Sequence, residues 1–147
     1  MKKHLRPLNN RAAFTLVEIL LVIAIIGMLV GLVIVNVGGT LDSANKDTAK
    51  IFVNQSLKTP LLMYRKDVRS YPSTAEGLTA LINPPAGKEK NWRGPYIEQG
   101  KDSLTDPWGN PYQYRSPGTH NATSYDVWSN GPDGQDGSAD DIGNWGN

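Results

Sequence analysis

An uninterrupted apolar run constrains the fold of this chain more than any other feature. Residues 19–35 contain no polar side chain. A helix of about 17 to 25 predominantly apolar residues can span the hydrocarbon core of a bilayer. The sequence therefore predicts a transmembrane helix at residues 14–37, followed by a single folded domain at residues 38–147.

A basic leader precedes this run. Residues 1–13 contain four Lys or Arg residues and no acidic residue, so the positive-inside rule places them in the cytoplasm and the domain outside it. A secretory signal peptide has an apolar core of only about 7 to 15 residues, with a small-residue cleavage site after it. Here the core is longer, and the small-residue junction at Ala12 and Ala13 precedes it.

Glu18 lies near the start of the apolar run. An acidic side chain at the centre of a membrane helix costs roughly 2.5 to 3.5 kcal/mol, and less toward the ends, so such a residue usually has a partner. Cleavage before Phe14 would create an α-amino group, which could pair with Glu18 of a neighbouring subunit. The alternative is that Glu18 lies at the level of the lipid headgroups as an interfacial residue.

The composition excludes several classes of protein. The 147 residues suffice for one domain and an anchor. No cysteine is present, which excludes disulfides, a thiol nucleophile and a cysteine metal site. Loss of the four leader cations would leave 11 Lys and Arg against 14 Asp and Glu, so no broad basic surface remains for nucleic acid.

The helical pattern continues beyond residue 37 in amphipathic form. Apolar or small residues recur at three- and four-residue spacing, at Leu41, Ala44, Thr48, Ile51, Phe52, Leu57, Leu61 and Tyr64. This spacing predicts a helix that continues to about residue 66. An interior proline removes a backbone hydrogen bond and clashes with the preceding turn, so we expect a kink or a new helix start at Pro60.

Signals for a short helix and a small sheet follow. Ser73 and Glu76 have the spacing of a capping box, in which each side chain binds a free backbone N–H at a helix start, and this predicts a helix at about residues 74–82. Aromatic and β-branched residues predict two antiparallel strands, at about residues 111–116 and 124–129. The expected fold class is α+β, with the long N-terminal helix packed on this sheet.

The C-terminal segment is acidic and rich in glycine. No Lys or Arg follows Arg115, whereas five aspartates do: Asp126, Asp133, Asp136, Asp140 and Asp141. Calcium suits such a segment, because it takes about six to eight oxygen ligands from carboxylates and backbone carbonyls in flexible geometry. On spacing alone, a solvated acidic tail is an equally good interpretation.

Two sets of motifs resemble known families. The string AFTLVE at residues 13–18 resembles the processing site of type IV prepilins, although Ala13 replaces the usual glycine. Further segments resemble the major pseudopilins of type II secretion systems, general secretion pathway protein G. These segments are YPST at residues 71–74, NWRGPY at 91–96, DPWGNPYQY at 106–114, SNGPDG at 129–134 and DDIGNW at 140–145.

The resemblance implies a pilin-like fold and a structural function. A prepilin peptidase would cleave between Ala13 and Phe14, Phe14 would become N-methylated, and Glu18 would serve assembly. The chain would then be the major subunit of a pseudopilus, polymerising from the bacterial inner membrane to drive export of folded proteins across the outer membrane. The helix would be a single-pass anchor with the domain in the periplasm, and the implied partners are further copies of the chain, minor pseudopilins and the inner-membrane assembly platform.

The resemblance also implies a calcium site in the loop at about residues 129–145. Asp133, Asp140 and Asp141 would contribute side-chain ligands, while Asn130 and Gln135 would contribute backbone carbonyls. Asp136 has no counterpart in the family site, so we leave it outside.

No constellation typical of an enzyme is found in the sequence. It contains neither carboxylates in a recognisable acid–base setting nor a glycine-rich loop that opens a helix to hold phosphate. We therefore expect no catalysis. Two other hypotheses remain open: a type IV pilus pilin, although its usual C-terminal disulfide loop cannot form here, and a membrane-anchored periplasmic binding module that keeps its leader.

Overall fold

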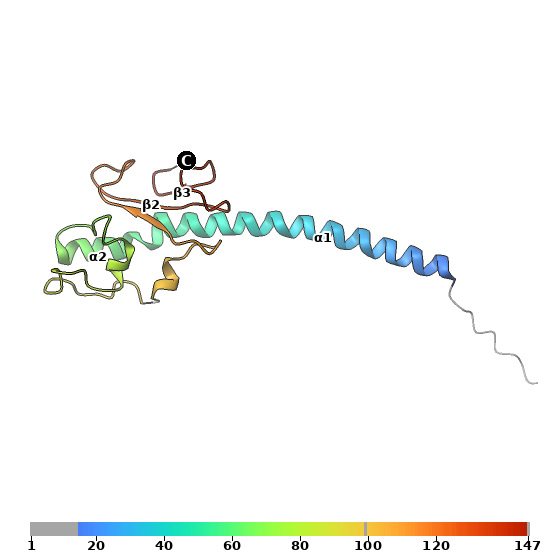
Figure 1. Ribbon diagram of the computed structural model, residues 1–147, viewed down its shortest axis with the longest axis horizontal. Coiled ribbons are helices and arrows are strands. Elements are labelled where there is room, and N and C mark those ends of the chain that lie inside the picture. The colour runs from blue at the N-terminus through green and yellow to red at the C-terminus, as the bar shows by residue number, and fades with distance from the viewer. Residues whose placement is uncertain (1–14, 99, 147) are drawn as a thin grey trace, which may run out of the picture. The chain divides into compact units, whose positions relative to one another are not determined.

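A computed structural model of the chain describes residues 15–98 and 100–146, with the side chains of all of these except residues 33–38. Ala13 and Phe14, the predicted processing residues, lie outside the described part. Two compact units are present, Met1–Gly39 and Thr40–Asn147. The helices and strands are labelled in Figure 1.

Helix α1 (Leu16–Ile51) is the main element of the first unit and continues into the second. Gly38 and Gly39 do not interrupt it. The large apolar side chains described at residues 16–32 are all exposed, by 49 to 76%. Among the described residues, no helix is both long enough and apolar enough to cross a membrane.

The helical region of the second unit contains one π-helical turn between two α-helical segments. After α1 the chain forms a π-helical turn, η1 (Phe52–Ser56), and then α2 (Lys58–Val68). The backbone N–H of Leu57 donates to the carbonyl of Phe52 at 3.2 Å, the five-residue step of a π-helix. Pro60 lies in the first turn of α2, where its missing N–H breaks no helical bond. The new helix start that Pro60 predicts is therefore present.

The buried face of these helices differs partly from the predicted one. Its fully buried residues are Ala49, Val53, Leu57, Leu61 and Tyr64. The predicted stripe was wrong at four exposed positions, Leu41, Ala44, Thr48 and Ile51, of which Leu41 is 58% and Ile51 is 52% exposed. The π-helical turn holds one more residue per hydrogen-bonded ring than an α-helical turn. Three consecutive four-residue steps, from Ala49 to Leu61, therefore stay on one buried face. Regular α-helical spacing would mix steps of three and four residues.

Three short strands form an antiparallel sheet in the order β1 (Gln113–Arg115), β2 (Asp126–Ser129) and β3 (Ile142–Gly143). Tyr114 pairs with Val127, so the predicted antiparallel pair is confirmed. Both strands are shorter than expected. Strand β3 lies within the segment predicted to be a loop, because two residues with no alternating pattern give no local strand signal.

The predicted capping box is present, but it does not start an α-helix. Glu76 Oε2 accepts from the backbone N–H of Ser73 at 2.7 Å, and Ser73 Oγ accepts from that of Glu76 at 3.3 Å. The helix predicted at about residues 74–82 is instead a turn followed by the 3-10 helix η2 (Leu78–Leu81). Gly77 explains the difference, because its φ of 59° and ψ of −168° are not helical.

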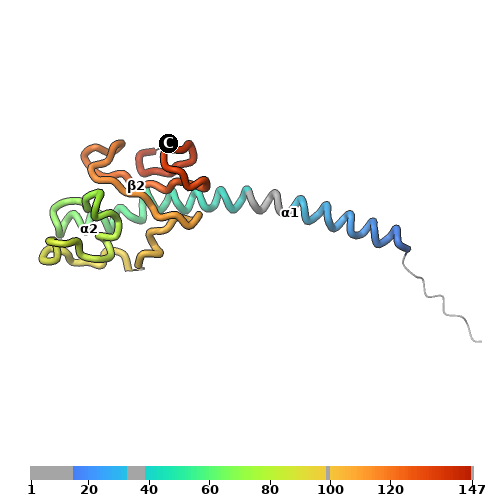
Figure 2. Tube along the Cα trace, viewed as in Figure 1, coloured from blue at the N-terminus to red at the C-terminus, as the bar shows by residue number. Residues whose placement is uncertain are grey.

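The hydrophobic core of the second unit lies between the helical segments and the sheet. It includes Val53, Leu57, Leu61, Tyr64, Leu78, Leu81, Leu104, Tyr114, Tyr125 and Val127. Phe52 extends it by stacking on Tyr112 with the ring centroids 4.3 Å apart. The C-terminal segment folds back beside β2 (Figure 2), which positions the acidic loop described next.

Candidate functional site

The loop between β2 and β3 contains all the residues predicted to bind calcium. Antiparallel pairing of Ser129 with Ile142 brings the two ends of this loop together. Asn130 therefore directly follows the paired residue Ser129, and Asp141 directly precedes its partner Ile142. The sheet thus fixes both ends of the acidic segment.

The three predicted side-chain ligands meet at the hydroxyl of Ser138. Its Oγ donates to Asp140 Oδ1 at 2.5 Å. The same atom lies 3.4 Å from Asp133 Oδ1 and 3.4 Å from Asp141 Oδ1. One oxygen each of Asp133, Asp140 and Asp141 therefore lies within 3.4 Å of the Ser138 hydroxyl oxygen. Ser138 was missed, because a lone serine in a glycine-rich loop carries no signal of its own.

Backbone amides also hold these carboxylates. The N–H of Gln135 donates to Asp133 Oδ1 at 2.8 Å, and that of Gly137 to Asp141 Oδ2 at 2.8 Å. The Ser138 hydroxyl lowers the pKa of the Asp140 carboxyl, burial opposes this effect, and the N–H of Asp133 adds to the lowering. These donors therefore favour the charged form of Asp140.

Asn130 contributes an unpartnered oxygen. Its Oδ1 is buried and accepts no hydrogen bond, while its Nδ2 donates to the carbonyl of Gly134 at 3.3 Å. A buried acceptor without a donor costs about 1 to 3 kcal/mol, and a bound cation would offset that cost. The sequence predicted Asn130 as a ligand through its backbone carbonyl and did not predict this side-chain oxygen.

Gly131 allows the two arms of the loop to touch. Its φ is 65°, and a Cβ at this position would lie 2.5 Å from the carbonyl oxygen of Asp140 and 2.8 Å from Asp140 Oδ2. Any larger residue would push Asp140 away and would also be strained at this φ. The close approach of the Gly131 backbone thus helps to place one predicted ligand.

Asp136 makes a separate contact with the sheet. Its Oδ1 accepts from the indole Nε1 of Trp128 at 2.9 Å. The carboxylate of Asp136 therefore has a structural partner of its own.

The donor set suits calcium. Across residues 15–98 and 100–146, no three His, Cys, Asp or Glu side chains form a cluster that could hold a metal ion. Calcium does not require such a cluster, because amide and backbone carbonyl oxygens ligate it together with carboxylates in flexible geometry. The converging aspartates and the unpartnered oxygen of Asn130 fit this requirement.

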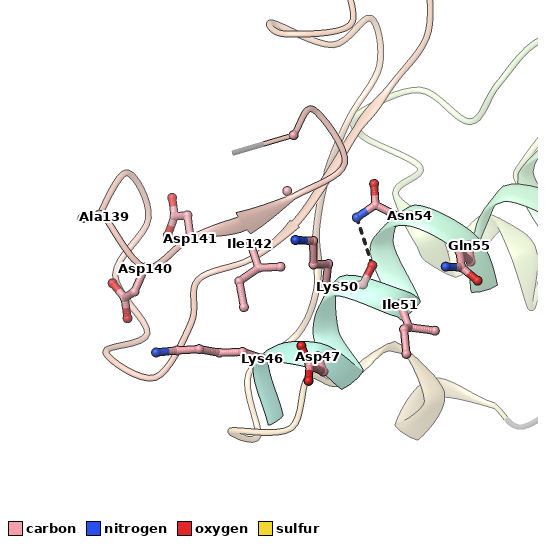
Figure 3. A pocket seen from close by; sticks show the side chains of 12 residues that line it. Lys46, Asp47, Lys50, Ile51, Asn54, Gln55, Ala139, Asp140, Asp141 and Ile142 are labelled. Atoms are coloured by element: carbon pink, nitrogen blue, oxygen red, sulfur yellow. Dashed lines mark hydrogen bonds between the residues drawn. The ribbon is translucent and has the colours of Figure 1, made fainter. Parts of the chain in front are cut away.

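Two lysines of α1 face the acidic loop across a groove. Lys46 and Lys50 line it on one side, and Asp140 and Asp141 on the other. Figure 3 shows Lys46 extending toward the loop segment that carries Asp140. A 2.8 Å ion pair with Asp42, and more weakly the charge of Asp140, raise the pKa of Lys46. The groove therefore has cations on its helix side.

Glu18, the predicted assembly residue, has a local partner. Its Oε2 accepts from the backbone N–H of Thr15 at 2.8 Å and from Thr15 Oγ1 at 3.0 Å, and Thr15 Oγ1 accepts from the Glu18 N–H at 3.3 Å. This is a capping box at the start of α1. The spacing of Thr15 and Glu18 is that of a capping box, so the sequence could have predicted this contact, but we did not predict it.

Two family profiles match the chain. The family described as Type II secretion system (T2SS), protein G matches residues 36–145. The chain belongs to this family. The prokaryotic N-terminal methylation motif matches residues 8–34, which include the predicted processing site.

Similar proteins agree with this membership of the protein G family. The chain is 42% identical over 145 residues to the type II secretion system core protein G of Pseudomonas aeruginosa, covering 95% of this chain and 98% of that one. It is 42% identical over 146 residues to the protein of the same name from Escherichia coli K12, covering 97% and 96%. The crystal structure of the major pseudopilin from the type 2 secretion system of enterohaemorrhagic Escherichia coli is 37% identical, with a TM-score of 0.63, covering 73% of this chain and 87% of that one.

These comparisons confirm the predicted resemblance, the pilin-like α+β fold and the main functional interpretation, a pseudopilus subunit. They favour it over a type IV pilus pilin and over a periplasmic binding module. Membership of a structural secretion family with a methylation motif implies a membrane-anchored place in the cell envelope and assembly with other secretion components. The calcium site stays a prediction.

Proposed function

We propose that this chain is the major structural subunit of its pseudopilus, a helical homopolymer that grows from the bacterial inner membrane and drives folded proteins across the outer membrane. The exposed apolar surface of α1 carries this proposal. Large apolar side chains at residues 16–32 are 49 to 76% exposed, and burying one fully stabilises by about 1.5 to 3 kcal/mol. Such a surface needs a cover from outside the chain.

Two different environments would bury this surface in turn, first lipid and then the helices of neighbouring subunits. Before assembly, lipid surrounds it, with the basic leader in the cytoplasm and the Thr40–Asn147 unit in the periplasm. In the filament, the equivalent helices of neighbouring copies replace the lipid. Lipid tails and apolar side chains are alike in polarity, so this exchange does not expose the helix to water. The same helix thus serves as anchor and then as filament core.

Processing would prepare Glu18 for assembly. Cleavage by a prepilin peptidase between Ala13 and Phe14 creates an α-amino group, which is then methylated on Phe14. In the isolated chain, the neutral donors of Thr15 hold the Glu18 carboxylate. A protonated amine adds the attraction between opposite charges, which the neutral donors of Thr15 lack, so the amine of a neighbouring subunit would compete with Thr15 and fix the axial position of that subunit.

Calcium would hold the loop between β2 and β3 in one conformation. Asp133, Asp140 and Asp141 would bind it, with further oxygens from Asn130 and Gln135. The convergence of the three carboxylates and the unpartnered Asn130 Oδ1 support this assignment. When bound, the ion supplies positive charge that offsets carboxylate repulsion. The loop would then present a fixed surface for polymerisation.

The proposed activity is packing and assembly, without catalysis. The partners are further copies of the chain, minor pseudopilins and the inner-membrane assembly platform. Substrate export follows from filament growth, so no reacting group is required on this chain.

Replacement of Glu18 tests the assembly mechanism. In bacteria that lack their own protein G, Glu18→Ala should be inserted and processed but should form no filaments and restore no secretion. Thr15→Ala is the matched control, because it removes the local cap and leaves the carboxylate for the neighbouring amine. Normal filaments and secretion with Glu18→Ala would overturn the mechanism.

The start of the mature chain tests the processing step. Sequencing of the membrane-extracted protein should begin at N-methylated Phe14. An intact Met1 would contradict processing and would favour the membrane-anchored binding module.

A further inference from the structure

The turn that begins at Asp106 is built around a buried carboxylate. Asp106 is 4% exposed, and its Oδ1 accepts from the backbone N–H groups of Trp108 at 3.1 Å and Asn110 at 2.8 Å. The turn is closed by an isolated bridge between Thr105 and Pro111. These contacts use one oxygen of the carboxylate and leave the other available to a different part of the fold.

The second oxygen reaches the end of β2. Asp106 Oδ2 accepts from the hydroxyl of Ser129 at 2.5 Å, and Ser129 is fully buried. Since an ionised carboxylate only accepts hydrogen bonds, the Ser129 proton points to Asp106. The Ser129 oxygen then accepts from the backbone N–H of Gly131 at 3.1 Å. A chain of two hydrogen bonds thus runs from Asp106 to the acidic loop.

The two hydrogen bonds end at Gly131, which lies against the predicted ligand Asp140. Gly131 is the residue whose backbone touches Asp140, where a Cβ would lie 2.5 Å from the Asp140 carbonyl oxygen. The turn makes a second approach through Asn110, whose Nδ2 would lie 3.4 Å from a Cβ on Gly134. Asn110 of the turn thus lies near Gly134, and the hydrogen-bonded link to the loop is the one at Gly131.

We propose that Asp106 is a positioning residue for the calcium loop, acting through the Ser129 hydroxyl on the Gly131 backbone. This inference rests on the calcium site proposed above. The negative charge of Asp106 fixes the direction of the Ser129 hydroxyl, and the hydroxyl fixes the segment from which Asn130 and Gly131 meet Asp140. Asp106 itself touches no ion and lies outside the set of ligands.

Two substitutions perturb this chain of contacts at different points. Asp106→Asn keeps one oxygen for the turn, but it replaces the charged acceptor facing Ser129 with an amide donor. Ser129→Ala keeps the whole turn and removes the link to Gly131. Substitutions that disturb the groups orienting metal ligands typically weaken metal affinity by about 10 to 100-fold. We expect a calcium dissociation constant about tenfold higher for each variant.

Asp126→Asn is the matched control. Asp126 is also a buried aspartate, 1% exposed, but its carboxylate accepts from Thr119, His120 and Asn121 in a different loop. This variant should lower the melting temperature equally in chelator and in calcium. It should bind calcium with the affinity of the unaltered chain.

The test is calorimetric titration of calcium chloride into the full chain in detergent, with thermal unfolding in EGTA and in calcium. Weaker binding by both Asp106→Asn and Ser129→Ala, with unaltered binding by Asp126→Asn, is the expected result. Unaltered affinity in either of the first two, when folded, would overturn the positioning role even if its melting temperature fell. No binding by the unaltered chain would instead overturn the calcium site. If Asp106→Asn fails to fold, Ser129→Ala decides alone.

Discussion

The imidazole of His120 stacks on the indole of Trp145, with ring centroids 4.0 Å apart and planes within 10° of parallel. Trp145 also covers Gly143 of β3, where a Cβ would collide with the indole ring. The last residues of the chain therefore bind the loop around residue 120 to the strand that closes the acidic loop.

Loss of this stack should destabilise the second unit. Trp145→Ala should lower the free energy of unfolding by about 1 kcal/mol or more, since an aromatic pair contributes about 0.5 to 1.5 kcal/mol beyond its buried area. Trp145→Phe should retain most of it. Urea unfolding gives the energies, and loss of the ring-current shift on the His120 protons reports the stack directly. An unshifted His120 spectrum in Trp145→Ala would contradict the contact.

Acid should remove the contribution of Asp126. Burial raises its pKa, but the N–H donors of His120, Asn121 and Thr119 lower it more, to below its ordinary value. A depressed folded pKa means that the stabilisation is present above the unfolded pKa of about 3.9 and is lost as the pH falls through the folded value. Asp126→Asn should be less stable at pH 7 by about 1 to 3 kcal/mol. In urea titrations this difference should shrink below pH 4, and a constant difference would refute the assignment.

The capping box at Ser73 and Glu76 should contribute measurably. Ser73→Ala should lower stability by about 0.5 to 1.5 kcal/mol, the usual net contribution of one hydrogen bond. Ser70→Ala, at an exposed position nearby, is the control. Equal unfolding curves for both variants would show that the capping box contributes nothing measurable to the free energy of unfolding.

Calcium removal should destabilise the chain, and the aspartates should not behave alike. At free calcium a hundredfold above the dissociation constant, the ion contributes about 2.7 kcal/mol. Thermal unfolding should therefore occur at lower temperature in EGTA. Asp133→Asn and Asp140→Asn should lose this difference. Asp136→Asn should keep it, because an asparagine oxygen can still accept from Trp128 Nε1. Loss of the calcium effect in all three variants would argue for general charge screening.

Ala13 should limit the rate of processing. It stands where prepilins usually have glycine, so Ala13→Gly should speed cleavage and Ala13→Leu should slow or stop it. The ratio of unprocessed to mature chain after a pulse of radiolabel measures both. Equal rates for alanine and glycine would show that this position tolerates either small residue.

Local signals in the sequence were largely sufficient for the fold. Ser73 and Glu76 bind each other's backbone as their spacing predicts, and the segments around Tyr114 and Val127 pair antiparallel. These features depend on neighbouring residues or on alternation along one strand. Strand β3 depends on pairing with a distant segment, and no pattern within two residues records it.

The candidate site was predictable only in part. Asp133, Asp140 and Asp141 were named as ligands through the family resemblance, and in the structure they share a contact with Ser138. Their binding of calcium stays a prediction. Neither the contact of Ser138 nor the burial of Asn130 Oδ1 could be predicted, because both arise from how the loop closes on itself. Their positions depend on three-dimensional packing that residue spacing alone does not encode.

The π-helical turn at Phe52–Ser56 has an evolutionary consequence. Because it accommodates one residue more than α-helical geometry requires, deletion of a single codon there could restore an ordinary α-helix while Leu57, Leu61 and Tyr64 still faced the sheet. Elsewhere in the helix, such a deletion would rotate every later side chain away from the core. Changes in helix length among descendants of this gene should therefore accumulate at this turn.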